Sequence, residues 1–398
     1  MKLELDPSAD LGLPAEDRGT TRSAVPARIV VRGVNWLGDA VMSTPALLRL
    51  REAYPQARIT LLTAAKLAEL FRGHPAFDEI TTFTPVDRVW SIARRLRHAR
   101  FDLGLILPNS PRSAIELWLG RVQRRIGLAA PLRNLFLTDA VPALPEFTPM
   151  VKLSARDIRA CVASPSRQGR FVPPARAHHV HHYLHLAAAA GASAKPLAPF
   201  LPVTEAELDA TRARFGLDDR RWFGLNPGAE YGPAKRWPAD RFAAVAVAAQ
   251  QRWRCRWVIL GGTGDVAVAD EIAGQIVRGN RETSGHAPPA DPLVLAGRTS
   301  LRELCAILKL CQVVLTNDTG PMHLAAAVGT PVVVPFGSTS PELTGPGLPG
   351  DSRHACLRVE VPCAPCFRRT CPIDFRCMLG IDATAILENL ARIVETDR

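Results

Sequence analysis

Short apolar runs alternate with longer amphipathic stretches along most of the chain. The apolar runs are rich in Val, Ile and Leu and end at turn residues, as in strands buried on both faces of a parallel sheet. The stretches between them place apolar residues at helical spacing. Strand and helix therefore alternate, which predicts an α/β fold made of doubly wound sheets.

The alternation occurs twice. The strands predicted in the first half are Arg28–Arg32, Arg58–Thr63, Glu79–Phe83, Asp102–Leu107 and Arg124–Gly127, with an extended piece at Leu135–Thr138. The helices predicted there end near Glu52, then span Ala65–Phe71, Asp87–Arg97 and Arg112–Leu119, with a further helix ending at Ala190. The segment Glu146–Ala177 is rich in Pro, Ser and Arg and predicts a loop-rich region.

The pattern restarts after a short proline-rich segment. The strands predicted in the second half are Trp222–Asn226, Trp257–Leu260, Leu293–Ala296, Val313–Leu315 and Val332–Pro335. The helices predicted there are Glu205–Phe215, Ala239–Arg252, Val266–Arg278, Leu301–Leu310, Met322–Val328 and Thr384–Val394. We therefore predict a first domain over 27–194, a linker over 195–203 and a second domain over 204–398. Residues 1–26 lack a continuous apolar core, so we expect a disordered leader there, neither signal peptide nor anchor.

Composition agrees with a soluble enzyme, because 47% of the 398 residues are hydrophobic and 22% are charged. Lys and Arg number 49 against 38 Asp and Glu, and the net charge of +11 favours an acidic partner. A phosphorylated glycolipid, an anionic membrane surface and nucleic acid all qualify. The arginines form only small clusters without an aromatic-rich basic stripe, so nucleic-acid binding is not expected. Nine cysteines without a secretory signal indicate a reducing compartment.

The stretch Gln312–Glu342 predicts a phosphate site at the turn between a strand and a helix. Short polar residues and Gly320 follow the strand, and amides at a helix start favour a phosphate. Thr319 and His323, one turn apart, would face it. Asp318 would repel phosphate, so we assign it to a sugar or ribose hydroxyl, or to a cation bridging to a diphosphate. The alternative is an ordinary turn, with Asp318 as a helix cap and His323 in the core.

Other turns at the carboxyl ends of the predicted strands also bear polar groups. Asp39 begins the helix after the first strand, where its alternative role is to complement the helix dipole. In the second half, the turns after three predicted strands contain further polar or glycine residues, which are Asn226, Gly228 and Lys235, Asp265, and Thr299. These turns and the 316–320 turn are expected to meet at one edge of the sheet. A nucleotide with a diphosphate suits that edge, because Lys235 can reach a diphosphate and the acids can bind ribose hydroxyls.

Three motifs in this order resemble glycosyltransferase family 9, the ADP-heptose:lipopolysaccharide heptosyltransferases. They are W-L-G-D-A-V-M-S-T-P-A-L, N-P-G-A-E-Y-G-P-A-K-R-W-P and T-N-D-T-G-P-M-H-L-A-A-A-V-G-T-P, and the second is most similar to heptosyltransferase II. The resemblance implies a GT-B architecture. Two Rossmann-like domains would face each other, with the acceptor on the first and ADP-heptose on the second.

The resemblance also implies roles for single residues. Asp39 would be the general base, and Lys235 would neutralise the leaving diphosphate. The remaining donor-binding positions would be Asn226, Gly228, Asp265 near the ribose, Thr299 against the adenine, and Asp318, Thr319, Gly320 and His323 at the phosphate and sugar. The acceptor would be a lipid A-core glycolipid, and the enzyme would be cytoplasmic and peripheral to the inner membrane. No cofactor is expected for the chemistry, with Mg²⁺ at the diphosphate left open.

Two other interpretations compete with heptose transfer. One is a GT-B protein that uses another nucleotide sugar, as a transferase or an epimerase. The other is a non-catalytic protein that binds a nucleotide sugar or an anionic surface.

Two clusters have metal-ligand residue types. Cys363, Cys366, Cys371 and Cys377 form C-x2-C-x4-C-x5-C, which predicts a structural zinc or iron site, with reduced thiols as the alternative. The other cluster comprises His178, His179, His181, His182 and His185 near a helix start. Because no acid or cysteine accompanies these histidines in register, they predict a solvated helical face rather than a metal site.

Overall fold

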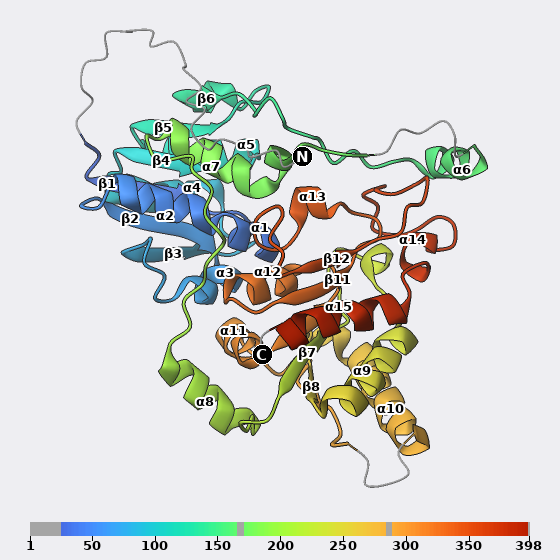
Figure 1. Cartoon of the computed structure of the whole chain (residues 1–398). Helices are drawn as coiled ribbons and strands as arrows, with labels where there is room; N and C mark the ends of the chain where they lie inside the picture. The colour runs from blue at the N-terminus through green and yellow to red at the C-terminus, as the bar shows by residue number, and fades with distance from the viewer. Residues whose placement is uncertain (1–24, 165–170, 284–288, 397–398) are drawn as a thin grey trace, which may run out of the picture.

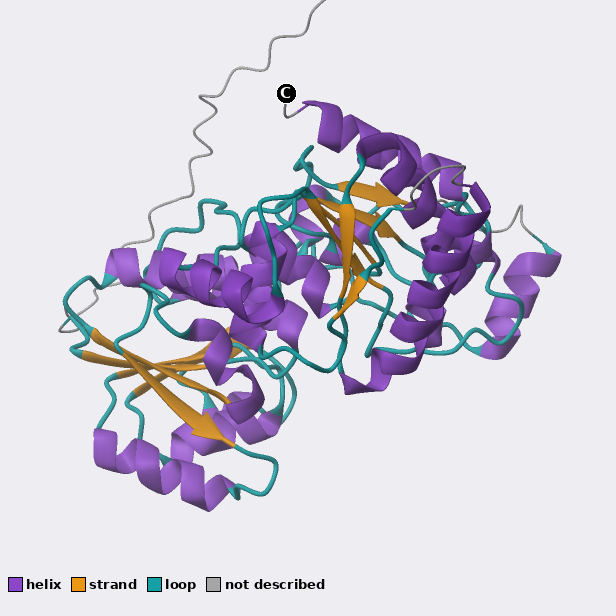
Figure 2. Ribbon diagram, turned by 90° about the horizontal axis from the view of Figure 1, so that it is seen from below, coloured by secondary structure: helices purple, strands orange, loops and turns teal. Residues whose placement is uncertain are grey.

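The computed structural model describes residues 25–164, 171–283 and 289–396 (Figure 1). Almost all of the expected leader lies outside these residues. Two six-stranded parallel sheets form the framework, each flanked by helices (Figure 2). The first has the order β3 (Glu79–Phe83), β2 (Arg58–Ala64), β1 (Arg28–Arg32), β4 (Leu103–Ile106), β5 (Arg124–Leu128), β6 (Asp139–Val141). The second has the order β12 (Ala355–Leu357), β11 (Val332–Pro335), β10 (Val313–Thr316), β7 (Trp222–Asn226), β8 (Arg256–Ile259), β9 (Leu293–Val294).

The central strand of the first sheet divides its side chains between two helical layers. Ile29 and Val31 join a core cluster with the helices α1 (Leu37–Met42), α2 (Thr44–Ala53) and α7 (His179–Ala189). Val30, which points to the other face, packs with α4 (Val89–Ala99) and α5 (Pro111–Leu119). This alternation along β1 follows from the two-residue period of a strand.

The second sheet is built in the same way. Val313 and Leu315 of β10 pack with the helices α9 (Ala239–Trp253), α10 (Val266–Thr283) and α15 (Ala383–Thr396). Val314 belongs to the cluster of α11 (Leu301–Leu310) and α12 (Gly320–Ala327), and α8 (Glu205–Phe215) packs on α11. The shorter elements are α3 (Ala65–Ala68), η1 (Glu69–Phe71), η2 (Asn134–Phe136), α6 (Ala155–Ala163), η4 (Ala175–Ala177), η5 (Pro233–Lys235), η6 (Thr263–Asp265), α13 (Pro341–Thr344) and α14 (Arg376–Leu379).

Helices α1 and α12 hold the two sheets' carboxyl edges together, and two glycines let them approach. A Cβ at Gly38 would lie 2.7 Å from Cδ2 of His323, and a Cβ at Gly320 would lie 2.6 Å from the Leu37 side chain. Because the two helices touch here, one hydrophobic cluster runs from β1 to β10 without a break. The two halves thus face each other at a packed contact.

A second contact between the halves is made by α6, which Figure 1 shows on the side of α14, away from the first sheet. The Leu153 amide donates to the Cys366 carbonyl over 3.1 Å. Ile158 and Cys161 of α6 pack with Cys363 and Cys366. The cysteine segment of the second half is therefore covered by a helix from the first half.

Most of the predicted strands and helices are confirmed, and the differences have local causes. The expected loop at Glu146–Ala177 contains α6, whose start is fixed by a capping box between Ser154 and Asp157. The extended piece expected at Leu135–Thr138 is wrong, because η2 occupies 134–136 and the strand follows as β6. The first helix breaks at Ser43 into α1 and α2.

The histidine cluster is not a solvated face, so that prediction is wrong. His178 is 1% exposed, and the other four histidines, which lie on α7, are partly buried. Among the described residues, no helix is long and apolar enough to cross a membrane.

Candidate active site

A cavity of about 370 Å³ opens between the two halves and receives side chains from both. The first half contributes Asp39 and its neighbours at the start of α1. The second half contributes Lys235 from the β7–α9 loop, and Asp318, Thr319, Gly320 and His323 from the start of α12. Six of the sequence-predicted site residues therefore meet in one place.

Asp39 is held by two side chains of α7. The Tyr183 hydroxyl donates to Oδ1 of Asp39 over 3.0 Å, and Nδ1 of His179 lies 3.7 Å from the same oxygen. Burial raises the pKa of Asp39, but the His179 contact and the Tyr183 hydrogen bond outweigh it, and the pKa is lowered overall. The pKa of Tyr183 is raised well above its ordinary value by burial and by the Asp39 charge. Asp39 is therefore a carboxylate at neutral pH, as a proton acceptor must be.

Lys235 forms an ion pair with Asp318, and their Nζ and Oδ2 atoms are 2.6 Å apart. The Lys235 side chain is 13% exposed and that of Asp318 is 4% exposed. The Thr339 hydroxyl donates to the same Oδ2. Nζ of Lys235 also lies 5.0 Å from the centroid of the Tyr231 ring. Asp318 thus holds Lys235 in this structure, and α12 has no side-chain cap. The assignment of Asp318 to a hydroxyl or a bridging cation stays a prediction.

The loop of Lys235 is fixed from two sides. Asn317, fully buried, donates from Nδ2 to the Pro227 carbonyl over 2.7 Å and accepts the Trp237 amide over 3.0 Å. On the other side, the Ala234 amide donates to the Arg369 carbonyl over 3.0 Å. Gly232, with φ of 148°, lets that carbonyl come close, because a Cβ there would lie 2.5 Å from it.

His323 lies beneath the cavity floor against Gly38. It is 5% exposed, and burial lowers its pKa to about 4, although the charges of Asp318 and Asp39 act in the opposite direction. The imidazole is therefore neutral at pH 7. It can donate one hydrogen bond to a bound anion but supplies no full positive charge. The lysines among the lining residues are the partly buried Lys235 and the exposed Lys152, whose Nζ lies 6.0 Å from the centroid of the Tyr231 ring.

The other predicted donor residues lie outside this cavity's lining. Asn226 is 2% exposed and its amide donates to the Thr316 hydroxyl over 3.3 Å, so it joins β7 to β10. Asp265 accepts the Gly262 amide over 3.0 Å and packs over Gly228, where a Cβ would lie 2.3 Å from its Oδ2. Thr299 directly precedes Ser300, the N-cap of α11. These residues lie at the carboxyl ends of β7, β8 and β9, on the predicted edge.

A second cavity of about 340 Å³ lies within the first half and shares Trp36, Asp39, Met150 and His179 with the first. Its other walls are the β4–α5 loop (Leu107–Asn109), the segment 147–150 and α7. Asp39 stands at the junction of the two cavities. A group bound in the second cavity would therefore meet a group bound in the first beside this carboxylate.

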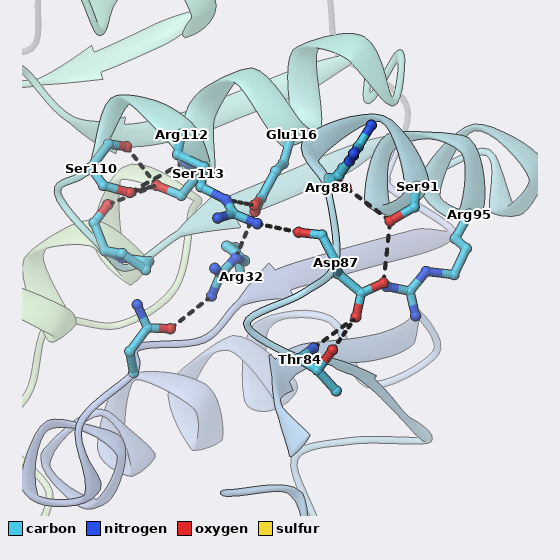
Figure 3. A network of polar contacts seen from close by, with 12 residues as sticks. Arg32, Thr84, Asp87, Arg88, Ser91, Arg95, Ser110, Arg112, Ser113 and Glu116 are labelled. Atoms are coloured by element: carbon cyan, nitrogen blue, oxygen red, sulfur yellow. Dashed lines mark hydrogen bonds and ion pairs between the residues drawn. The ribbon is translucent and has the colours of Figure 1, made fainter. Parts of the chain in front are cut away.

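A buried ion-pair network fixes the loop before Asp39 (Figure 3). Nε of Arg32 donates to Glu116 over 2.9 Å, and Nη1 donates to the Gly33 carbonyl over 2.6 Å. Arg112 bonds the second oxygen of Glu116 over 3.0 Å. The loop is thereby tied to α5, which limits the positions that Asp39 can take.

The four clustered cysteines lie near one another, and two of them, Cys363 and Cys366, pack against α6. Burial, followed by the charges of the neighbouring thiols, raises the pKa of Cys363, and the same causes raise that of Cys377 to about 12. Over the described ranges, no group of three or more Cys, His, Asp or Glu side chains is arranged to hold a metal ion. Four thiols in one segment remain a suitable donor set for zinc or iron, so the metal site stays a prediction.

The chain is similar to characterised proteins along most of its length. The sequence profile of "Glycosyltransferase family 9 (heptosyltransferase)" matches residues 143–375, more than half of the chain. "Lipopolysaccharide heptosyltransferase 2" of Salmonella typhimurium is 30% identical over 326 residues, covering 80% of this chain and 85% of that protein. The chain belongs to glycosyltransferase family 9.

Related family 9 proteins support the same assignment. The Escherichia coli "Lipopolysaccharide heptosyltransferase 2" is 29% identical over 333 residues, with 80% of this chain and 85% of that protein covered. The solved E. coli ADP-heptose lps heptosyltransferase II superposes with a TM-score of 0.72 at 25% identity, covering 93% of this chain and 99% of that one. This family 9 chain is a glycosyltransferase with the GT-B fold.

Sequence reasoning missed three residues at the site of this family 9 enzyme. Tyr183 contacts Asp39, and Thr339 contacts Asp318. Neither residue belongs to a recognisable motif. His179 was noticed only as one of a cluster of histidines. The signal that could have identified Tyr183 and His179 is their position four residues apart on α7, which places them on one helical face.

Proposed function

We propose that this glycosyltransferase moves a heptose from ADP-heptose to a heptose-bearing inner core of lipopolysaccharide, with inversion at the anomeric carbon. The names of its relatives support the donor and the acceptor class. The observation that carries the mechanism is that Asp39 from one half and the Lys235–Asp318 pair from the other line one cavity. A proton acceptor and a cation for a leaving group thus stand on opposite sides of one space.

In the proposed reaction the acceptor hydroxyl lies in the cavity of the first half. Its oxygen attacks the anomeric carbon while its proton passes to Asp39. The bond from that carbon to the diphosphate breaks, and the electron pair leaves with ADP. Lys235, together with the amides at the start of α12, stabilises the charge that develops on the diphosphate.

In this proposal each group of site residues binds one part of the donor, and none of these contacts requires a metal. A buried lysine that contacts the diphosphate can do the work for which other transferases use Mg²⁺. The turns holding Gly228, Asp265 and Thr299 would hold the nucleoside end of the donor, at the carboxyl ends of β7, β8 and β9. We further propose that the enzyme works at the cytoplasmic face of the inner membrane, because its acceptor is anchored there.

The test is mass-spectrometric detection of transfer from ADP-heptose to a core glycolipid that bears one heptose. A panel of UDP- and GDP-sugars serves as the comparison, since preference for one of them would contradict the proposed donor. Asp39→Asn preserves the size of the side chain but removes the base, so we expect transfer to fall by about 10²–10⁴-fold. Calorimetry should show ADP binding close to that of the unmodified chain. A variant with normal turnover would remove Asp39 from the role of base.

A further inference from the structure

One layer of the first half concentrates the positive charge of the whole chain. Residues 84–136, which include α4, α5 and η2, have ten arginines and three acids. That surplus of seven charges compares with a net charge of +11 for all 398 residues. The ten are Arg88, Arg94, Arg95, Arg97, Arg100, Arg112, Arg121, Arg124, Arg125 and Arg133. In the sequence these arginines form only small clusters, and the packing of α4 on α5 brings several of them together.

The three acids of this layer already have partners of their own. Glu116 is buried and pairs with Arg32 and Arg112. Asp102 accepts the backbone amides of Ala27 and Arg28 over 2.9 Å. Asp87 accepts from Thr84 and lies 3.6 Å from Arg95 (Figure 3). Arg95, Arg112 and Arg124 have carboxylate partners and Arg133 is buried. Arg94, Arg97, Arg100 and Arg121 form no ion pair with a described residue, so their charges remain available to an external anion.

Several of these arginines line a cavity of about 810 Å³ between α4 and the turn after α5. Its basic lining residues are Arg94, Arg97, His98, Arg100 and Arg121. No carboxylate is among the lining residues. Trp90 of α4 forms part of the same wall and is 69% exposed. The cavity thus combines guanidinium groups with a large aromatic ring at its mouth.

Two of these arginines occupy backbone positions that normally favour glycine. Arg100 ends α4 with φ of 52°, and Arg121 follows α5 with φ of 55°. Both angles lie in the left-handed region, which is unfavourable for a residue with a Cβ. Helix dipoles favour basic residues in a last turn, but they do not require one at the left-handed position itself. Both side chains line the cavity, so a change to glycine there removes a guanidinium group at a position whose backbone favours glycine.

Apolar side chains are exposed on the same layer. Trp118 of α5 is 46% exposed, Leu132 before η2 is 76% exposed, and Leu135 within η2 is 75% exposed. The Trp118 ring contacts Phe136 at 5.3 Å between centroids, which joins α5 to η2. Tryptophan beside arginine is typical of surfaces that lie at a lipid headgroup layer, and exposed leucines can enter the acyl boundary.

We propose that the α4–α5–η2 layer docks the enzyme on an anionic lipid surface, with a headgroup phosphate in the arginine cavity. Arginine surplus and exposed Trp90 match a negatively charged bilayer. Exposed aliphatic leucines favour lipid over nucleic acid, whose bases stack on aromatic rings. Asn109 of the acceptor cavity precedes α5 and Arg121 of the arginine cavity follows it, so these two residues lie at opposite ends of that helix. The docking surface is therefore argued from its own charge and apolar groups and does not rest on the proposed function.

The test is sedimentation of the full chain with vesicles of phosphatidylglycerol and phosphatidylcholine, against vesicles of phosphatidylcholine alone. We expect binding to the anionic vesicles that weakens as salt is added. The double variant Arg100→Gly/Arg121→Gly removes two guanidinium groups at positions where glycine is favourable, so folding is preserved. It should bind about 30-fold more weakly, if each arginine contributes as basic residues usually do at such surfaces.

The control is Arg254→Gly, which makes the same change at the left-handed end of α9 in the second half. It should bind vesicles like the unmodified chain. Equal binding to neutral vesicles, or equal binding by the double variant and the control, would overturn the proposal. So would tight binding to a single-stranded oligonucleotide that the same two substitutions abolish while vesicle binding persists.

Transfer in detergent micelles separates this proposal from the proposed function. The double variant should transfer heptose normally there, because neither arginine lines the catalytic cavity. If the unmodified chain binds anionic vesicles but transfers no heptose in detergent, the proposed function fails and the docking surface stands. If it transfers heptose in detergent but ignores anionic vesicles, the docking surface fails and the function stands.

Discussion

Asp39 shows how a carboxylate can be buried and still remain a base. Tyr183 and His179 both approach Oδ1, so we infer that Oδ2 receives the acceptor's proton. The hydrogen bond from Tyr183 stabilises the charged form of Asp39, which is why the pKa falls although burial opposes it. Tyr183 therefore acts as a positioning residue whose removal should change the pH dependence of transfer more than its maximum rate.

Tyr183→Phe removes the donated hydrogen bond and keeps the ring in place. The pKa of Asp39 should rise, because the carboxylate loses a donor while burial persists. Transfer needs the deprotonated form, so the acidic limb of the kcat/KM profile should move to higher pH. Tyr54→Phe is the matched control, since the Tyr54 hydroxyl donates to the Ala190 carbonyl and not to the site. Equal acidic limbs in the two variants would contradict the positioning role.

At the scale of elements, the loops that carry the site residues are fixed by hydrogen bonds to neighbouring loops. The β7–α9 loop presents Lys235 because Asn317 fixes it from the β10–α12 turn and the Arg369 carbonyl fixes it from the cysteine segment. The Tyr231 hydroxyl, which donates to the Phe367 carbonyl over 2.7 Å, adds a second tie to that segment. The cysteine segment therefore supports the catalytic loop whether or not it binds a metal.

Lys235→Met should both destabilise the fold and weaken donor binding, and a second substitution should separate the two effects. Without the lysine, the buried Asp318 carboxylate has lost its cation, which costs about 3 kcal/mol in the free energy of unfolding. Lys235→Met/Asp318→Asn removes the unpaired charge and should recover most of that loss. Both variants should bind ADP more weakly, because the cation for the diphosphate is gone.

Urea denaturation and ADP calorimetry measure the two quantities. Lys309→Met is the control, because Lys309 donates to the carbonyl of Val328, which lies at the end of α12 opposite to the site. If the double variant recovers ADP binding as well as stability, Lys235 does not contact the diphosphate.

Local patterns were enough to predict most elements but not the contacts between them. β1, β3, β7 and β11 match their predicted bounds. β1 and β11 were recognisable as apolar runs of buried parallel strands, whereas β3 is an edge strand whose side chains alternate in exposure. The capping box that starts α6 was present in the sequence, but it was obscured by the Pro- and Arg-rich segment around it. The bond between Tyr183 and Asp39 joins residues 144 positions apart, and no local rule predicts such a pair.

The whole molecule shares one hydrophobic cluster across both halves, and buried histidines lie along it. His178 is 1% exposed and bonds the Gly345 carbonyl through Nε2 over 3.2 Å, so it links α7 to the second half. His323 packs on Gly38 from the other direction. Since both lie at the contact between the halves, protonating them would place charge inside the packed interface.

Acidification should therefore destabilise the fold well before its carboxylates are neutralised. Burial lowers the pKa of His178 to about 3 and those of His74, His323 and His354 to about 4, against 6.5 for an unperturbed histidine. Between pH 6.5 and 4 the unfolded chain binds protons that the folded chain does not. Stability then falls as pH is lowered, by about 1.4 kcal/mol per pH unit for each such histidine.

Urea denaturation at pH 7.0, 6.0 and 5.0 measures this slope, and His74 isolates one contribution away from the catalytic cavity. His74→Gln removes one buried imidazole, so the slope should become shallower by about 1.4 kcal/mol per pH unit. His98→Gln is the control, because His98 is exposed on α4. Since the unfolded chains lose the same histidine charge in both variants, a difference between their slopes comes from the folded state. Equal slopes would mean that His74 takes up its proton while the protein is still folded.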